Sequence, residues 1–166
     1  IIPFFTVFIG MLLIYKLNFF KILFSSGYHG IIYVITFSVT NITFVVSIQN
    51  TNVANTLVMI ATAPMLSAIL SGIFLNERPD KSTWISIIIT LFAVFFIFYD
   101  SLGIGNFYGD ILGFITAVGL AVGAVTIRSA KSKNLVPAAV IGKLFVAMFA
   151  LLFIESLMLV EKDLII

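Results

Sequence analysis

The stretch from Val53 to Leu75 reads VANTLVMIATAPMLSAILSGIFL and contains no charged residue. A helix of about 20 apolar residues crosses a hydrocarbon core about 30 Å thick, so this stretch is long enough to span a bilayer. Only helices and closed barrels satisfy every backbone group in lipid, and barrel strands alternate apolar and polar residues, which this stretch does not do. It therefore predicts a transmembrane helix.

Five further apolar runs extend this pattern in both directions along the chain. They cover residues 1–15, 30–48, 82–99, 111–127 and 137–160. The chain of 166 residues is 61% hydrophobic and only 10% charged, whereas ordinary soluble domains are about 25% charged. The predicted fold class is an all-α polytopic membrane protein with about six transmembrane helices. Both ends of the chain lie in apolar sequence, so we expect a fragment of a longer protein.

Positive charge is distributed asymmetrically among the connections between these runs. Only Lys162 lies on one side of the predicted membrane. The other eight of the nine basic residues lie on the opposite side: Lys16, Lys21, Arg78, Lys81, Arg128, Lys131, Lys133 and Lys143. Loops rich in Lys and Arg stay in the cytoplasm, so that side is expected to be cytoplasmic. The lack of long loops fits a bacterial protein and predicts a multi-pass location in the cell inner membrane.

The composition argues against several classes of chemistry. The chain has no Cys and a single His, His29, whereas thiolate and histidine metal sites need several such ligands. No phosphate-binding loop of the type G-x-x-x-x-G-K-[ST] occurs, so ATP hydrolysis is not expected. Lys and Arg are spread through loops and not clustered on one face, which argues against a nucleic-acid partner. We expect no metal, no cofactor and no enzymatic activity.

Polar side chains recur along one face of the run 30–48. They fall at steps of three and four residues, the spacing of one helical face. The five positions are Tyr33, Thr36, Thr40, Thr43 and Ser47. Asn41 lies near the midpoint of the run. Two interpretations stay open: these groups bond carbonyls of their own helix and assist packing, or they form the polar wall of a water-filled cavity.

The run 53–75 carries a second polar face and a proline. Asn55, Met59 and Thr62 lie along that face, and Pro64 lies near the middle of the run. Because proline lacks a backbone N–H, Pro64 is expected to kink the helix. Interrupted helices are common at transporter binding sites, although a kink that only serves packing fits equally well.

The last two runs carry small residues and intramembrane charges. Two rows at the small-xxx-small spacing, which lets helices touch, predict that the helix 111–127 is contacted from two sides. The rows are Gly113, Ala117 and Ala121, and Gly119 and Gly123. In the run 137–160, Lys143 is expected to extend to the cytoplasmic interface. Glu155 either reaches the outer headgroups or titrates in proton coupling.

Motifs from residue 52 onward resemble those of a known superfamily. In order, they are Asn52-Val-Ala54-Asn55, Ala63-Pro64, Phe74-Leu75-Asn76-Glu77-Arg78, Trp84, Gly109-Asp110, Arg128 and Lys143-Leu-Phe145. With this order and spacing, the chain resembles the EamA type of the drug/metabolite transporter superfamily over about residues 30 to 150.

The resemblance implies a fold of ten helices in two inverted five-helix repeats. Residues 1–105 would be the end of the first repeat, with helices two to five, and residues 106–166 the start of the second, with helices six and seven. The solute cavity would lie between the repeats, lined by the helices 30–48, 53–75 and 111–127. Residues with structural or topological roles would be Glu77, Arg78, Trp84, Asp110, Arg128 and Lys143, with Glu77 fixing a loop or capping helix ends.

These observations predict a gradient-driven secondary transporter, an exporter of small metabolites or drug-like solutes. The residues expected to contact the solute are Thr36, Thr40, Asn41, Thr43, Asn55, Met59 and Thr62. The expected partners are a small-molecule solute, the lipid bilayer and the missing helices of the full-length chain, and the sequence gives no oligomeric state. The alternatives are a non-transporting membrane scaffold subunit and, with less support, a lipid-modifying membrane enzyme.

Overall fold

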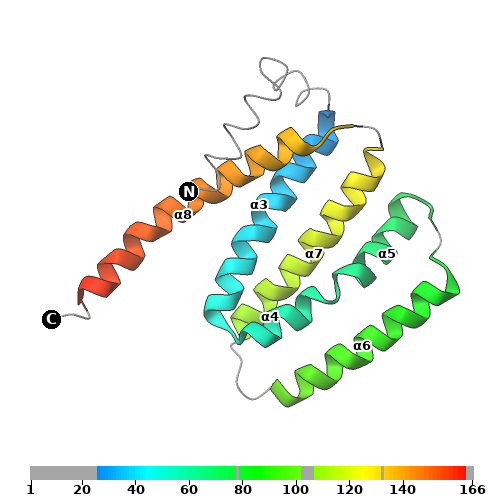
Figure 1. The fold of residues 1–166 in the computed structure, drawn as a ribbon, viewed down its shortest axis with the longest axis horizontal. Helices are drawn as coiled ribbons and strands as arrows, with labels where there is room; N and C mark the ends of the chain where they lie inside the picture. Colours follow the sequence, from blue (N-terminus) through cyan, green and yellow to red (C-terminus); the bar gives the residue numbers. More distant parts are fainter. Residues whose placement is uncertain (1–25, 78, 102–106, 132, 164–166) are drawn as a thin grey trace.

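A computed structural model of the chain describes residues 26–77, 79–101, 107–131 and 133–163, with side chains except at 94, 97–101 and 153–163. These residues form helices joined by short connections (Figure 1). The helices are α3 (Gly27–Asn50), α4 (Val53–Ile60), α5 (Ala63–Phe74), α6 (Lys81–Ser101), α7 (Phe107–Ser129) and α8 (Val136–Asp163). No strand occurs within the described ranges.

The structure confirms the predicted all-α membrane fold. Helices α3, α6, α7 and α8 agree with four predicted runs to within four residues at each end. Three helical segments are long and apolar enough to cross a bilayer: α3, the stretch Val53–Phe74 and α7. Shorter apolar stretches lie at Lys81–Ala93 and Val136–Leu152. The predicted helix 1–15 lies outside the described residues.

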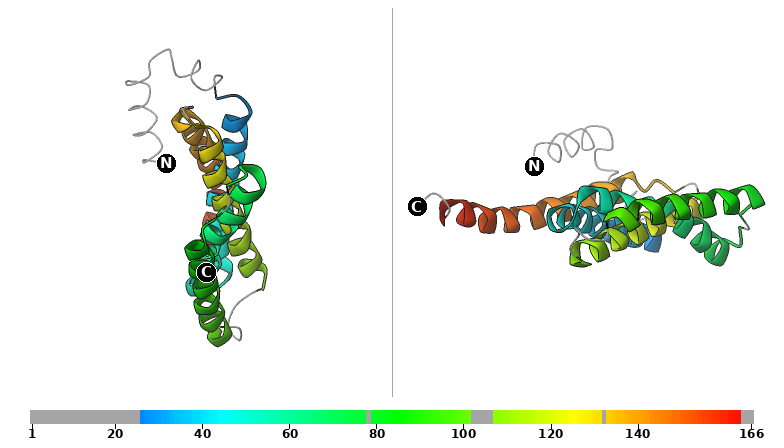
Figure 2. Two further views of the ribbon diagram at one scale, coloured as in Figure 1. Left: turned by 90° about the vertical axis from the view of Figure 1, so that its right-hand side faces the viewer. Right: turned by 90° about the horizontal axis from the view of Figure 1, so that it is seen from below.

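The helices lie side by side in a single thin layer (Figure 2). Helix α3 packs against α7 on one side and α8 on the other, and α7 also packs against α4 and α5. Helix α6 contacts α4. Large apolar side chains project from this layer, for example Phe96, which is 81% exposed. Such exposure is ordinary in a bilayer, because lipid tails are as apolar as the side chains themselves.

The predicted helix 53–75 is two helices in the structure, and not one kinked helix. Helix α4 ends at Ile60, and α5 begins at Ala63 with Pro64 in its first turn. Pro64 has no N–H for the carbonyl of Ile60, and its ring would collide with that carbonyl, so the helix ends there. The Thr62 hydroxyl and backbone N–H both donate to the Met59 carbonyl, at 2.6 and 3.1 Å.

The layer has two distinct ends. At one, which we call the hairpin end, the two residues Thr51 and Asn52 connect α3 to α4, beside the start of α7. At the other, which we call the basic end, α3 and α8 begin and α5 and α7 end (Figure 1). Here Ser26 donates to the carbonyl of Asn134 at 3.1 Å. Four described basic residues, in the connections or at the adjoining helix ends, lie at the basic end: Lys81, Arg128, Lys131 and Lys133.

Candidate functional site

The polar stripe predicted on the run 30–48 lies on the face of α3 that packs against α7. Thr43 shares a hydrogen bond of 2.8 Å with Thr116 of α7. A Cβ added at Gly119 of α7 would overlap the Thr40 hydroxyl. One turn further, a Cβ on Gly123 would lie 3.9 Å from the ring of Tyr33. The small residues of α7 therefore let its backbone approach the polar face of α3 closely.

Most polar groups on this part of α3 bond to their own helix. Thr36 donates to the carbonyl of Ile32 at 2.7 Å, and Asn41 donates to the carbonyl of Phe37 at 2.7 Å. Thr43 also approaches the carbonyl of Val39 at 2.9 Å. Hydroxyls in membrane helices commonly bond in this way. These groups are therefore satisfied whether or not α7 is in contact.

Thr40 differs from the other members of the stripe. Its side chain is buried, 8% exposed, and its hydroxyl has no hydrogen-bond partner. Leaving a buried polar group unsatisfied costs about 1–3 kcal/mol. The hydroxyl lies between α3 and Gly119 of α7, so a polar atom that entered this interface would meet an unoccupied donor.

A buried polar network ties α3 and α4 to α7 at the hairpin end. Ser47, fully buried, donates to the carbonyl of Gly109 at 2.7 Å and shares a 2.8 Å hydrogen bond with Thr56. Thr51 donates to the carboxylate of Asp110 at 2.7 Å. Asn55, 1% exposed, donates to the same carboxylate oxygen at 3.3 Å. Helices α3, α4 and α7 are thus joined by side chains as well as by packing.

Met59, a predicted residue of α4, meets the polar stripe of α3 where both pack against α7. A Cβ on Gly113 of α7 would lie 3.3 Å from the Met59 Cβ and 3.2 Å from the Ser47 hydroxyl. Gly113 is therefore the point where α3, α4 and α7 meet. Thr62 is buried at the break before α5 and bonds to Met59.

Sequence reasoning missed several polar partners of these residues. Thr56 and Thr116 are buried at 0% and 1% exposure, and Ser38 donates to the carbonyl of Gly142 in α8 at 3.1 Å. For Thr116 a signal was present, since it is a polar residue inside the small-residue run 111–127. Thr56 lies beside Asn55 at the start of the run 53–75.

An ion pair joins α7 to the segment after α5 at the basic end. Arg128 and Glu77 lie 2.5 Å apart, with side chains 56% and 48% exposed. Asn76 adopts a left-handed conformation with φ of 52°, and the next backbone N–H, of Glu77, donates to the carbonyl of Ser71. Both ionic side chains border a pocket of about 260 Å³. This turn directs Glu77 toward the C-terminal end of α7.

Replacing Glu77 with glutamine is expected to lower the free energy of unfolding by less than about 1 kcal/mol, because exposed ion pairs contribute little. The measurement is the thermal unfolding midpoint of the full-length protein in detergent, at low and high salt. High salt should remove most of the difference between Glu77→Gln and the wild type. A large loss that persists at high salt would contradict this weak contribution.

The remaining predicted positions are spread over other elements. Trp84 lies in the first turn of α6 and is 44% exposed. Lys143 is exposed on α8. Glu155 falls within α8, but its side chain and the whole of Arg78 lie outside the described residues. Among described residues, no three His, Asp or Glu side chains gather where they could hold a metal ion.

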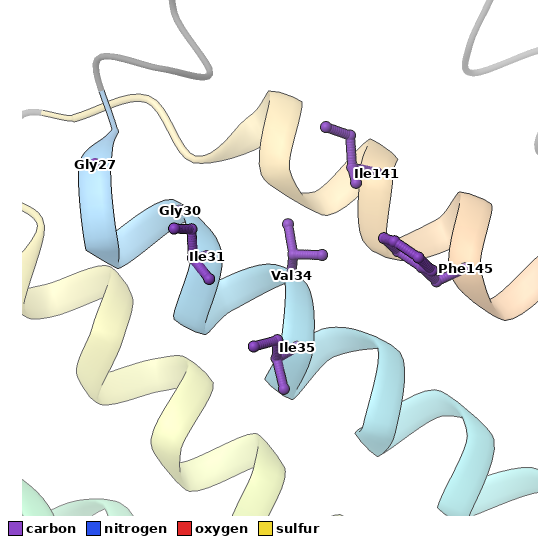
Figure 3. Close-up of a pocket in the computed structure, with 7 residues that line it drawn as sticks. All are labelled: Gly27, Gly30, Ile31, Val34, Ile35, Ile141 and Phe145. Atoms are coloured by element: carbon purple, nitrogen blue, oxygen red, sulfur yellow. The ribbon is translucent and has the colours of Figure 1, made fainter.

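A separate groove of about 420 Å³ lies between α3 and α8 (Figure 3). It is lined by Gly27, Gly30, Ile31, Val34, Ile35, Ile141 and Phe145. The lining side chains are all apolar and include none of the predicted site residues. Solute sites usually combine an apolar lining with a few placed polar groups, and this groove lacks such groups.

Comparison with known families supports the motif resemblance. The model of the EamA-like transporter family matches residues 1–99, more than half of the 166 residues. This match confirms the resemblance drawn from the motifs. Comparisons with curated proteins and with solved structures found no match. With its apolar helices and this family match, the chain belongs to the EamA-like transporter family of membrane proteins.

Proposed function

We propose that the chain is part of a gradient-driven secondary transporter that exports small metabolites or drug-like solutes across the inner membrane. In this proposal residues 1–105 belong to the first repeat and residues 106–166 to the second. The boundary separates α3 to α6 from α7 and α8. The solute path runs between α3 and α7, because alternating access moves one repeat against the other around a central site.

The position of the polar face of α3 carries this proposal. That face is directed at α7, the first helix of the proposed second repeat, and not at lipid. The buried hydroxyl of Thr40 has no protein partner there. A polar or amphipathic solute between the two helices would supply the missing partner. The uncharged side chains of the stripe favour neutral or zwitterionic solutes over strongly charged ones.

A non-transporting scaffold is the second candidate function, and one observation favours it. Thr36, Asn41 and Thr43 are satisfied within their own helix, as residues that serve packing alone would be. The two functions differ in whether water reaches the stripe. A scaffold keeps the α3–α7 interface dry, whereas a transporter must admit water and solute during its cycle.

Cysteine labelling in the full-length protein tests the proposal, since the chain has no Cys of its own. We expect Thr36→Cys and Thr43→Cys to react with a small water-soluble thiol reagent roughly tenfold faster than a lipid-facing control, because thiolates do not form in lipid. The matched control is Thr90→Cys: Thr90 on α6 is exposed and bonds its own helix at Ser86, at 2.8 Å.

Protection of the stripe by a candidate solute would identify the cargo. A reaction at Thr36→Cys as slow as at Thr90→Cys, in cycling protein, would overturn the transport pathway and leave the scaffold.

A further inference from the structure

The contacts that hold α3 against α7 differ between the two ends of the interface. Toward the hairpin end, side chains bond across it: Ser47 to the carbonyl of Gly109 and Thr51 to Asp110, each at 2.7 Å. Toward the basic end, Thr36 bonds its own helix, and Thr40 meets Gly119 without a hydrogen bond. Thr43 and Thr116 share a further hydrogen bond of 2.8 Å at the middle of the interface. Separating the helices therefore breaks polar bonds from the middle of the interface to the hairpin end.

Asp110 is the centre of the bonds at the hairpin end. It lies in the first turn of α7, where the helix dipole stabilises a carboxylate. One of its oxygens accepts from Thr51, in the turn after α3, and from Asn55, in the first turn of α4. Hydrogen bonds to a carboxylate are roughly twice as strong as neutral ones. A single charged group thus joins three elements.

The ion pair at the basic end is weaker than the hydrogen bonds to Asp110. Arg128 at the end of α7 pairs with Glu77, and both side chains are about half exposed. Water and salt screen such a pair, so it adds little. The pair also joins α7 to the segment after α5 and not to α3. Ser26, just before α3, donates to the carbonyl of Asn134 at 3.1 Å and accepts from Lys133 at 3.5 Å, so these bonds join α3 to the connection after α7 and not to α7 itself.

We propose that Asp110, with Thr51 and Asn55, is the gate that seals the hairpin end of the pathway, so that α3 and α7 separate first at the basic end. The role in transport rests on the proposed function, whereas the order of opening rests on the bonds alone. If the basic end is cytoplasmic, as the positive charges predict, the unloaded protein opens to the cytoplasm. An exporter must take up its solute from that side.

Distances between spin labels in the full-length protein test this order of opening. One pair, at Gln49 and Phe107, reports the hairpin end, and a second, at Ile31 and Ile127, reports the basic end; all four side chains are exposed. Asp110→Asn keeps the shape and removes the charge. We expect it to raise the ratio of open to closed hairpin ends about tenfold, without widening the basic end.

Two other variants separate the gate from a general loss of structure. Thr51→Val removes one donor but keeps Asp110, and should raise the open fraction by a smaller factor. Thr36→Val, which removes a hydroxyl bonded only to its own helix, should leave both distance distributions unchanged.

The proposal is overturned if neither Asp110→Asn nor Thr51→Val widens the hairpin end, or if Thr36→Val widens it equally. Because the distances are measured without solute, they do not depend on transport. If the cysteines on the stripe stay unlabelled, the transport pathway is rejected. If the hairpin end nevertheless opens in Asp110→Asn, the role of Asp110 in closing that end is retained.

Discussion

Gly109→Ala is expected to lower the free energy of unfolding of the full-length protein by about 1–3 kcal/mol or more, the usual cost of overpacking. A Cβ at this position would lie 2.7 Å from the Thr51 Cβ and 2.8 Å from the backbone carbon of Asn50. Backbone atoms cannot rotate away as a flexible side chain can. The turn after α3 would have to move from the start of α7. The measurement is the unfolding midpoint in detergent.

Gly123→Ala is the matched control for this substitution. It lies on the same helix, and its new Cβ would make an ordinary contact at 3.9 Å with the ring of Tyr33. Gly123 lies in the helix interior, where alanine gains about 1 kcal/mol of helix propensity over glycine, so Gly123→Ala should be at least as stable as the wild type. Equal midpoints for the two variants would show that α3 and α7 do not approach as closely as described.

The second large effect is expected from Ser47→Ala. The Ser47 hydroxyl is fully buried and bonds both the Gly109 carbonyl and the Thr56 hydroxyl. Removing it leaves a buried carbonyl without this partner, at a cost of about 1–3 kcal/mol. Unfolding of the full-length protein in detergent measures the loss. Thr90→Val, which removes an exposed hydroxyl on α6, should cost far less.

A double-mutant cycle with Thr56→Val isolates the bond between the two side chains. If Ser47 and Thr56 act together, the double variant should lose less stability than the two single losses added together. Strict additivity would mean that the cost of Ser47→Ala arises from Gly109 alone.

The helices could be predicted from the sequence because the bilayer imposes their length and excludes other backbone structures. Their bounds in the structure differ from the predicted runs by at most four residues for α3, α6, α7 and α8. At Pro64 the sequence predicted only a kink. Whether a helix bends or stops depends on where the freed carbonyl and N–H groups find partners, and here Thr62 turns back to Met59.

Less of the candidate site could be predicted from the sequence. Periodicity assigned Thr36, Thr40 and Thr43 to one face of a helix, but it does not say which neighbour covers that face. The partner, Thr116, lies 73 residues from Thr43 in the chain. The bonds from Thr51 and Asn55 to Asp110 likewise depend on how two distant helix ends meet. Roles of the predicted solute contacts stay predictions until the stripe is labelled.

The single-layer arrangement has a consequence for the energetics of movement. Each helix keeps its backbone hydrogen bonds within itself, so parting two neighbours breaks none of them. In a layer one helix thick, such a parting also disturbs no third element stacked above or below. The described helices can therefore move as rigid rods, and the polar bonds that resist such movement are those between neighbouring helices, such as Ser47 to Gly109, Ser47 to Thr56 and Asn55 to Asp110.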